Sequence, residues 1–144
     1  MKIEIIEDDR LLGQALEIFL KKEGYETALA RSCREARERL EPSVCLLLVD
    51  ITLPDGDGIR LYRELTKSRP IPGIFLTARD EEGDMLAAFD AGADDYVVKP
   101  FPMQVLSRRI RAVLRRSEAR QGQVLVCREL TLWPERKEAS LAGQ

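Results

Sequence analysis

The chain has 144 residues and a formal net charge of −2, with 44% hydrophobic and 33% charged residues. This composition fits one soluble globular domain with a small appendage, and it implies no overall affinity for nucleic acid. The chain has no histidine and no CxxC motif, which excludes Ser-His-Asp and Cys-His hydrolases. It shows no signal peptide and no apolar run that would span a membrane, so a cytoplasmic protein is expected.

The first two predicted β-α units open the chain. An apolar strand at 3–6 precedes a helix with apolar side chains at the i, i+3, i+4, i+7 and i+8 spacing of one buried face. The residues at this spacing are Leu12, Ala15, Leu16, Phe19 and Leu20. Gly24 ends the helix, a strand follows at 25–30, and a capping box of Ser32 and Glu35 begins the next helix.

The next strand, residues 44–49, is apolar throughout and is followed by a carboxylate, Asp50. Because apolar and polar residues do not alternate, both faces of the strand should be covered, as in the centre of a parallel sheet. A charge is costly inside such a core, so Asp50 should lie just beyond the strand, where open parallel sheets bind ligands. The alternative is a solvated aspartate that opens the turn at 53–58.

The remaining elements continue the same alternation. A helix follows Gly58, a strand at 73–76 leads to a helix that Gly92 ends, and a strand at 96–98 leads to the last long helix. The side chains expected on the buried faces of these helices are Ile59, Leu61, Tyr62, Leu65, Met85, Ala88, Phe89, Val105 or Leu106, Ile110, Val113 and Leu114. Five β-α units in succession predict an α/β fold, a doubly wound five-stranded parallel sheet with helices on both faces.

Residues 117–122 are polar and are expected to form a linker. Short strands at 124–126 and 130–133, with a third candidate at 139–141, follow without a helix to cover them. A few strands alone rarely hold together, which suggests the opening of a truncated second domain. The expected division is a domain at 1–118, a linker at 119–122 and a short C-terminal β segment at 123–144.

Polar residues follow four of the five predicted strands at the point where each strand ends. Glu7 and Asp8 follow the first strand, Asp50 the third, Thr77 the fourth and Lys99 the fifth. The carboxyl ends of parallel strands share one edge, so these side chains should meet there. Three crowded carboxylates favour a bound cation, and oxygen ligands favour Mg²⁺. A lysine and a hydroxyl beside an aspartate suit a phosphoryl group, which the aspartate itself can accept.

Taken together, these residues resemble the receiver domain of bacterial response regulators over residues 1–118. The shared motifs are Glu7-Asp8, Asp50 before Leu53-Pro54-x-x-x-Gly58, Thr77-Ala78, Gly92-Ala93-Asp94-Asp95-Tyr96 and Lys99-Pro100-Phe101. The resemblance implies the flavodoxin-like receiver fold with strand order 2-1-3-4-5. The stretch from Leu125 to Gly143 is similar to the opening β-strands of the winged-helix output domain of OmpR/PhoB-type transcription factors.

The resemblance implies roles for the acidic residues of this edge. Asp50 would accept a phosphoryl group from a histidine of a sensor kinase. Mg²⁺ would be held by Asp8, Asp50 and the backbone carbonyl of Thr52, and by Glu7 through water. The chain would not be an enzyme in the ordinary sense, because it would catalyse only its own phosphoryl transfer and dephosphorylation.

The resemblance also implies roles for the other residues of the edge. Lys99, Thr77 and Ala78 would contact the phosphoryl group, and the peptide bond between Lys99 and Pro100 would be cis. Tyr96 would rotate inward behind the phosphoryl group as part of a switch. Without the resemblance, Tyr96 is equally well interpreted as an ordinary strand aromatic.

An arginine run on the last helix has three interpretations: a solvated face, a DNA-binding patch or one side of a dimer contact. Its members are Arg108, Arg109, Arg111, Arg115, Arg116 and Arg120. Nearby acids favour the dimer, which the resemblance also implies, with Asp90, Asp94 and Asp95 facing Arg109, Arg115 and Arg116 across a two-fold axis. Met85 and Val105 stand where relatives often place a charged pair, so an apolar contact is expected there.

The sequence thus predicts the receiver of a two-component response regulator. Phosphorylation would switch its homodimerisation, and the full-length protein would bind promoter DNA through the missing output domain. One alternative is a stand-alone receiver that relays phosphate or binds a protein partner. Another is a phosphatase of the haloacid-dehalogenase type, but those enzymes place an acid two residues after the nucleophile, where Thr52 stands. Asp9 is expected to cap the helix that follows it.

Overall fold

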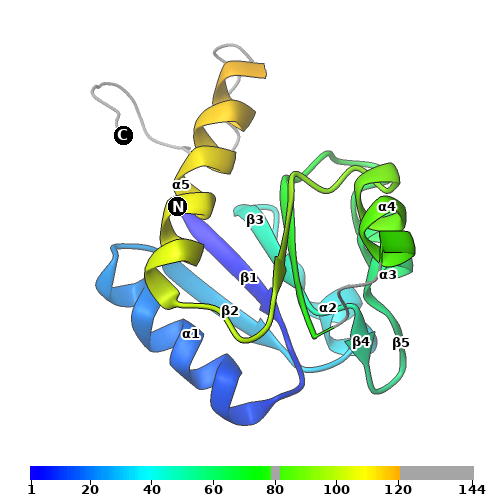
Figure 1. Ribbon diagram of the computed structural model, residues 1–144, viewed down its shortest axis with the longest axis horizontal. Helices are drawn as coiled ribbons and strands as arrows, with labels where there is room; N and C mark the ends of the chain where they lie inside the picture. The colour runs from blue at the N-terminus through cyan, green and yellow to red at the C-terminus, as the bar shows by residue number, and fades with distance from the viewer. Residues whose placement is uncertain (79–81, 121–144) are drawn as a thin grey trace.

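The computed structural model describes residues 1–78 and 82–120, which form a five-stranded parallel sheet between helices (Figure 1). The strands lie in the order β2 (Glu26–Ala30), β1 (Lys2–Ile6), β3 (Val44–Val49), β6 (Gly73–Thr77) and β7 (Asp95–Val98). All neighbouring pairs in this sheet are parallel. The doubly wound sheet and its order 2-1-3-4-5 are confirmed, because β6 and β7 are the fourth and fifth strands of the sheet along the chain.

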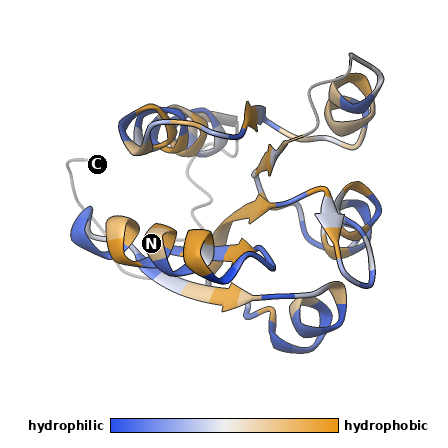
Figure 2. Cartoon of the chain, turned by 60° about the horizontal axis from the view of Figure 1, so that its bottom comes forward, coloured by the Kyte–Doolittle hydropathy of each residue, from blue (hydrophilic) through white to orange (hydrophobic). Residues whose placement is uncertain are grey.

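Five helices in the described part of the chain cover the two faces of the sheet (Figure 2). One face carries α1 (Arg10–Lys22) and α5 (Met103–Arg120), and the other carries α2 (Cys33–Arg39), α3 (Gly58–Leu65) and α4 (Glu82–Asp90). All six residues of β3 are buried, and from Leu46 to Val49 they alternate between the two cores that these helices close. The prediction of a central strand covered on both faces is confirmed.

The winding of the sheet reverses between β1 and β3. The chain passes from β1 to β2 on one side and then crosses to β3 on the other side of β1. Ile6 and Val49, the last residues of β1 and β3, lie opposite each other in the ladder. The residues that follow them therefore emerge at the same level, at the reversal point where open α/β sheets form their binding crevice.

The helix ends follow the predicted capping chemistry with one difference. Asp9 caps α1, where its Oδ1 accepts hydrogen bonds from the amides of Leu11 and Leu12 at 3.0 and 3.2 Å. The residues that follow α1 and α4 include glycines with positive φ, at +98° for Gly24 and +101° for Gly92. The hydroxyl of Ser32 caps α2 as expected, but the carboxylate of Glu35 accepts from the amide of residue 31 instead of that of Ser32.

Two predicted core positions are wrong. Ala15 is exposed, because the sheet covers only the arc of α1 around Leu16 and Leu20. Phe89 is 45% exposed, because α4 turns Ala88 into the core and Phe89 lies one residue, about 100° of helical rotation, further round. Both errors come from assigning too wide an arc of the helix to the buried face.

Three features depart from the sequence-based expectation or extend it. The stretch after Asp50, expected to be a turn, forms an antiparallel hairpin of β4 (Thr52–Leu53) and β5 (Gly56–Asp57). Glu4, in the middle of β1, is only 1% exposed. Residues 119 and 120, expected to belong to the linker, continue α5, whereas the rest of the linker and the expected β segment at 123–144 lie outside the described residues. Of the helices described, none has the length and apolar character needed to cross a membrane.

Candidate functional site

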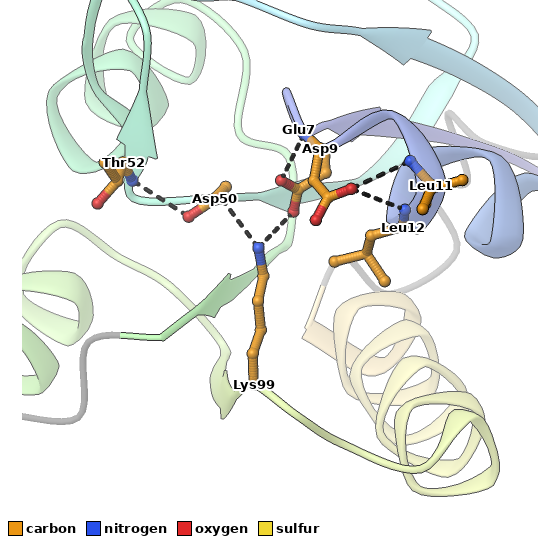
Figure 3. A network of polar contacts seen from close by, with 7 residues as sticks. All are labelled: Glu7, Asp9, Leu11, Leu12, Asp50, Thr52 and Lys99. Atoms are coloured by element: carbon orange, nitrogen blue, oxygen red, sulfur yellow. Dashed lines mark hydrogen bonds and ion pairs between the residues drawn. The ribbon is translucent and has the colours of Figure 1, made fainter.

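The carboxyl-end edge of the sheet brings Glu7, Asp50 and Lys99 together, as Figure 3 shows. The amino group of Lys99 donates to Glu7 Oε1 at 2.8 Å and to Asp50 Oδ2 at 3.0 Å. The other oxygen of Asp50, Oδ1, accepts from the amide of Thr52 at 3.1 Å. The side chains converge from β1, β3 and β7, as the placement of polar residues after these strands predicts.

The two carboxylates beside Lys99 are buried. Glu7 is 1% and Asp50 6% exposed, whereas Asp8 is exposed. Burial raises the pKa of Glu7 to about 7, although hydrogen bonds from Lys99 and from the amide of Asp9 favour its charged form. Burial also opposes the charge on Lys99, but hydrogen bonds to Glu7 and Asp50 outweigh it and hold the lysine pKa above its usual value. The site thus holds the ammonium group of Lys99 between the carboxylates of Glu7 and Asp50, which are both shielded from water.

The acidic residues fit a divalent cation. Glu7, Asp8 and Asp50 each offer one carboxylate oxygen, and these oxygens lie within 4.8 Å of one another. The donor set contains only oxygen, and it combines two buried carboxylates with an exposed one. These are properties that Mg²⁺ prefers, because it binds few carboxylates and keeps several waters.

The other predicted residues of this edge lie around the same site. Thr77 ends β6 and is buried, and its carbonyl accepts from the amide of Lys99 at 2.8 Å. Ala78, next in the chain, is exposed. The peptide bond between Lys99 and Pro100 is cis. Tyr96 in β7 is buried among the residues of the core beneath α2, α3 and α4, and its rotation stays a prediction.

The predicted dimer residues are only partly brought together. Arg109 on α5 pairs with Asp95 of the same chain at 3.0 Å, and Arg116 donates to the carbonyl of Asp94 at 3.4 Å. Arg115 instead lines a surface hollow with Arg108 and Arg111, the residues seven and four positions before it. Asp90 is exposed, and of the apolar pair Val105 is exposed while Met85 packs half-buried against the core.

Sequence reasoning missed Asp55 in the turn after Asp50. Its carboxylate accepts hydrogen bonds from the amides of Cys33 and Arg34 at the start of α2, at 2.7 and 3.0 Å. An aspartate between Pro54 and Gly56 in a turn gives no sign of a partner more than 20 residues away. No local pattern in the sequence marks this contact.

Comparison with known proteins gives a consistent result. Residues 3–111 match the response regulator receiver domain. The transcriptional regulatory protein BasR of Escherichia coli (strain K12) is 41% identical over 146 residues, which cover 100% of this chain and 66% of BasR. A two-component response regulator from Clostridium difficile is 33% identical with a TM-score of 0.78, over 81% of this chain and 98% of that one. The BeF3-activated N-terminal receiver domain of Klebsiella pneumoniae RstA is 32% identical with a TM-score of 0.75, over 80% and 99%.

The matched range includes Glu7, Asp8 and Asp50, and the strand order places these residues at the reversal point of the sheet. The agreement of sequence, sheet topology and edge chemistry leads to one conclusion. This chain belongs to the response regulator receiver domain family of two-component systems.

Proposed function

We propose that Asp50 is the phosphoacceptor of this receiver and that a histidine of a sensor kinase is the donor. The observation that carries this proposal is the pairing of the Asp50 carboxylate with Lys99 at 3.0 Å, beside Glu7 and Asp8. A carboxylate oxygen of Asp50 attacks phosphorus as the bond from phosphorus to the imidazole nitrogen breaks. The product is an acyl phosphate on Asp50, and the imidazole leaves with the electron pair of the broken bond.

Residues of the chain position this transfer. The amide of Thr52 and the amino group of Lys99 fix both oxygens of Asp50, and Lys99 lies where it neutralises negative charge on a transferring group. Asp8, Asp50, the Thr52 carbonyl and, through water, Glu7 would hold Mg²⁺. The bound cation would stabilise the charge of the phosphoryl oxygens. The hydroxyl of Thr77 and the backbone of Ala78 are the remaining contacts proposed for the phosphoryl group.

Phosphorylation is proposed to act as a switch through Thr77 and Tyr96. Thr77 and Tyr96 lie on adjacent strands, and Tyr96 pairs with Phe75 two residues before Thr77. A dianion at Asp50 would draw Thr77 toward it and change the packing around the buried Tyr96 ring. The face of α4, β7 and α5 would then associate with its copy in a second chain. The proposed contact residues are Met85, Asp90, Asp94, Asp95, Val105, Arg109, Arg115 and Arg116.

The output is proposed by analogy with the relatives. BasR is named a transcriptional regulatory protein, and this chain spans about two thirds of its length. A full-length form would carry a winged-helix domain of the OmpR/PhoB type that binds promoter DNA, with residues 1–118 as receiver and 119–122 as linker. A stand-alone receiver is the alternative. The two differ in whether the reading frame continues past Gln144 into an amphipathic helix.

The test of the phosphoacceptor is covalent labelling. Incubation with Mg²⁺ and acetyl phosphate should place one acid-stable, base-labile phosphoryl group on Asp50, as intact-mass and peptide mass spectrometry would show. Asp50→Asn should abolish it, because an amide is not a nucleophile. Exposed Asp90, replaced by Asn, is the matched control and should label as the wild type does. Undiminished labelling in Asp50→Asn would contradict the proposal.

A further inference from the structure

The hairpin that follows Asp50 is joined to α2 by Asp55. The two carboxylate oxygens of Asp55 accept one hydrogen bond each, from the amides of Cys33 at 2.7 Å and Arg34 at 3.0 Å. These amides open α2, where the helix provides no acceptor for them. They also hold the pKa of Asp55 below its usual value. Asp55 is therefore a cap supplied to α2 by another part of the chain.

The contact between the hairpin and α2 is also tight. A methyl group added at Gly56 would lie 3.0 Å from the buried sulfur of Cys33, closer than real Cβ atoms usually approach. α2 has its own cap as well, because Ser32 Oγ accepts from the amide of Glu35 at 3.1 Å. Helix α2 thus carries two caps of different kinds: Ser32 is local, and Asp55 is the one that reaches across to the hairpin.

The other end of the hairpin meets the phosphoacceptor. The amide of Thr52 donates to Asp50 Oδ1 at 3.1 Å, and Thr52 pairs with Asp57 across the hairpin. The amide of Gly58 donates to the carbonyl of Ile51 at 2.7 Å. A movement of the hairpin therefore moves the Thr52 backbone, and with it the orientation of the Asp50 carboxylate.

The hairpin has little internal stability of its own. Its ladder consists of the pairs Thr52 with Asp57 and Leu53 with Gly56, and isolated two-stranded ribbons are marginal at best. Its tip is exposed at Pro54 and Asp55. The two hydrogen bonds to α2 attach this tip to a helix that packs on the sheet. A short displacement of groups that orient a reacting side chain or a metal ligand is costly to a site.

We infer that Asp55 is a positioning residue, which anchors the β4–β5 hairpin on α2 and so holds the Thr52 backbone in place beside Asp50. The inference rests on the proposed function, because it assigns Asp55 a part in Mg²⁺ binding and phosphoryl transfer at that site. Asp55 acts through Thr52 and touches neither the phosphoryl group nor the cation. The same contact links α2 to the state of the phosphoacceptor loop.

Removal of each cap of α2 separately tests this inference in the 144-residue chain. Asp55→Ala removes the cap that joins the helix to the hairpin, and Ser32→Ala removes the local cap and leaves the hairpin contact intact. Asp55→Asn removes the charge but keeps an acceptor oxygen. Titration calorimetry with magnesium chloride gives the Mg²⁺ affinity, thermal melting without Mg²⁺ gives the stability, and acetyl phosphate labelling gives the transfer rate.

Asp55→Ala should weaken Mg²⁺ binding by about tenfold, the lower end of the effect of losing a group that orients a metal ligand. Ser32→Ala should lower the melting temperature with the wild-type Mg²⁺ affinity, and Asp55→Asn should recover part of the lost affinity. An unchanged affinity in Asp55→Ala overturns the inference. An equal loss of Mg²⁺ affinity in Ser32→Ala also overturns it, because helix stability would then be the cause. An Asp55→Asn affinity no better than that of Asp55→Ala overturns it as well, because the charge of Asp55 would then be the cause.

These results separate the inference from the proposed function. If the wild-type chain labels on Asp50 and Asp55→Ala binds Mg²⁺ equally well, only the role of Asp55 is wrong. If the wild-type chain neither binds Mg²⁺ nor labels, the proposed function fails and the role of Asp55 fails with it.

Discussion

The amino group of Lys99 lies 2.8 Å from Oε1 of Glu7, a carboxylate that is 1% exposed. The same amino group contacts Asp50 Oδ2 at 3.0 Å. Lys99 therefore supplies, at the phosphoacceptor, the positive charge that a metal ion would also supply. The lysine and a cation compete for the same two carboxylates, although both favour phosphoryl transfer.

Replacement of Lys99 by Met should separate these two effects. Labelling of Asp50 by acetyl phosphate should slow by about 10²–10³, the usual loss when one charge-stabilising donor is removed. The Mg²⁺ affinity should rise, because the acidic residues lose their internal cation. Labelling kinetics and titration calorimetry would measure the two quantities. Lys2→Met, which removes a lysine paired with Glu41 at the other end of β1, should change neither; a weaker Mg²⁺ affinity in Lys99→Met would contradict the competition.

Asp8 provides a test of where the cation binds. Glu7, Asp8 and Asp50 repel one another, so Mg²⁺ that binds only the folded chain should raise its melting temperature, by the equivalent of about 2.7 kcal/mol at a concentration of 100 times the dissociation constant. Asp8→Ala should be no less stable than the wild type without Mg²⁺ and should lose the Mg²⁺-dependent increase. Calorimetric melting with and without Mg²⁺ is the measurement. An unchanged increase in Asp8→Ala would place the cation elsewhere.

Glu4 should make stability depend on pH. It is 1% exposed in β1, its Oε1 has no hydrogen-bond partner, and burial raises its pKa to about 7. Lys2 and Arg39 favour its charged form but do not offset this burial, and the negative charge of Glu41 raises the pKa further. A carboxyl with a raised folded-state pKa stabilises the fold only while it is protonated. Its contribution is thus complete below pH 4.5 and is lost as the pH rises to about 7.

Glu4→Gln should therefore raise the free energy of unfolding by up to about 3 kcal/mol above pH 7, with little change at pH 4. Denaturant unfolding at a series of pH values is the measurement. Glu26→Gln, at an exposed position of β2, should leave the pH dependence as it is. An equal effect of Glu4→Gln at pH 4 and pH 8 would show that Glu4 does not titrate in this range.

The pair of Arg109 with Asp95 inside one chain changes the design of a dimerisation test. Arg109→Glu should preserve labelling of Asp50 but prevent dimerisation of the phosphorylated chain, and Asp95→Arg should do the same. A mixture of the two variants restores the charge pair only between chains, since within each chain the charges still repel. Sedimentation of the mixture should therefore recover part of the dimer, by the modest amount expected of exposed pairs worth about 0.2–1 kcal/mol each. Full dimerisation of phosphorylated Arg109→Glu would place the interface elsewhere.

The salt dependence of this dimer provides a second measurement. Of the proposed apolar pair, Val105 on α5 is exposed and Met85 on α4 is half-buried, and salt does not screen apolar contact. The dimer should persist at salt concentrations that abolish purely ionic association. Val105→Asp should weaken it at every salt concentration, and a dimer lost on modest addition of salt would contradict an apolar contribution.

Residues that follow strands were predictable from sequence, whereas residues that join elements were not. Asp50 and Lys99 follow apolar runs, and parallel topology brings strand ends together, so their meeting follows from the order of elements. Asp55 and Glu4 depend on which helix covers which part of the sheet, and neither periodicity nor composition contains that information. Phe89 was misplaced for a related reason, because helical spacing gives the direction of a buried face but not its width.

The close approach of Gly58 to the backbone of Asp50 has a consequence for how this chain tolerates mutation. A Cβ at position 58 would lie 2.1 Å from the Asp50 carbonyl oxygen and 2.9 Å from Cα of Ile51. Both obstacles are backbone atoms, which cannot yield as a flexible side chain would. In a library that samples every single substitution, position 58 should tolerate as few replacements as position 50. Substitutions that abolish function would then be concentrated at a glycine that takes no part in any chemistry.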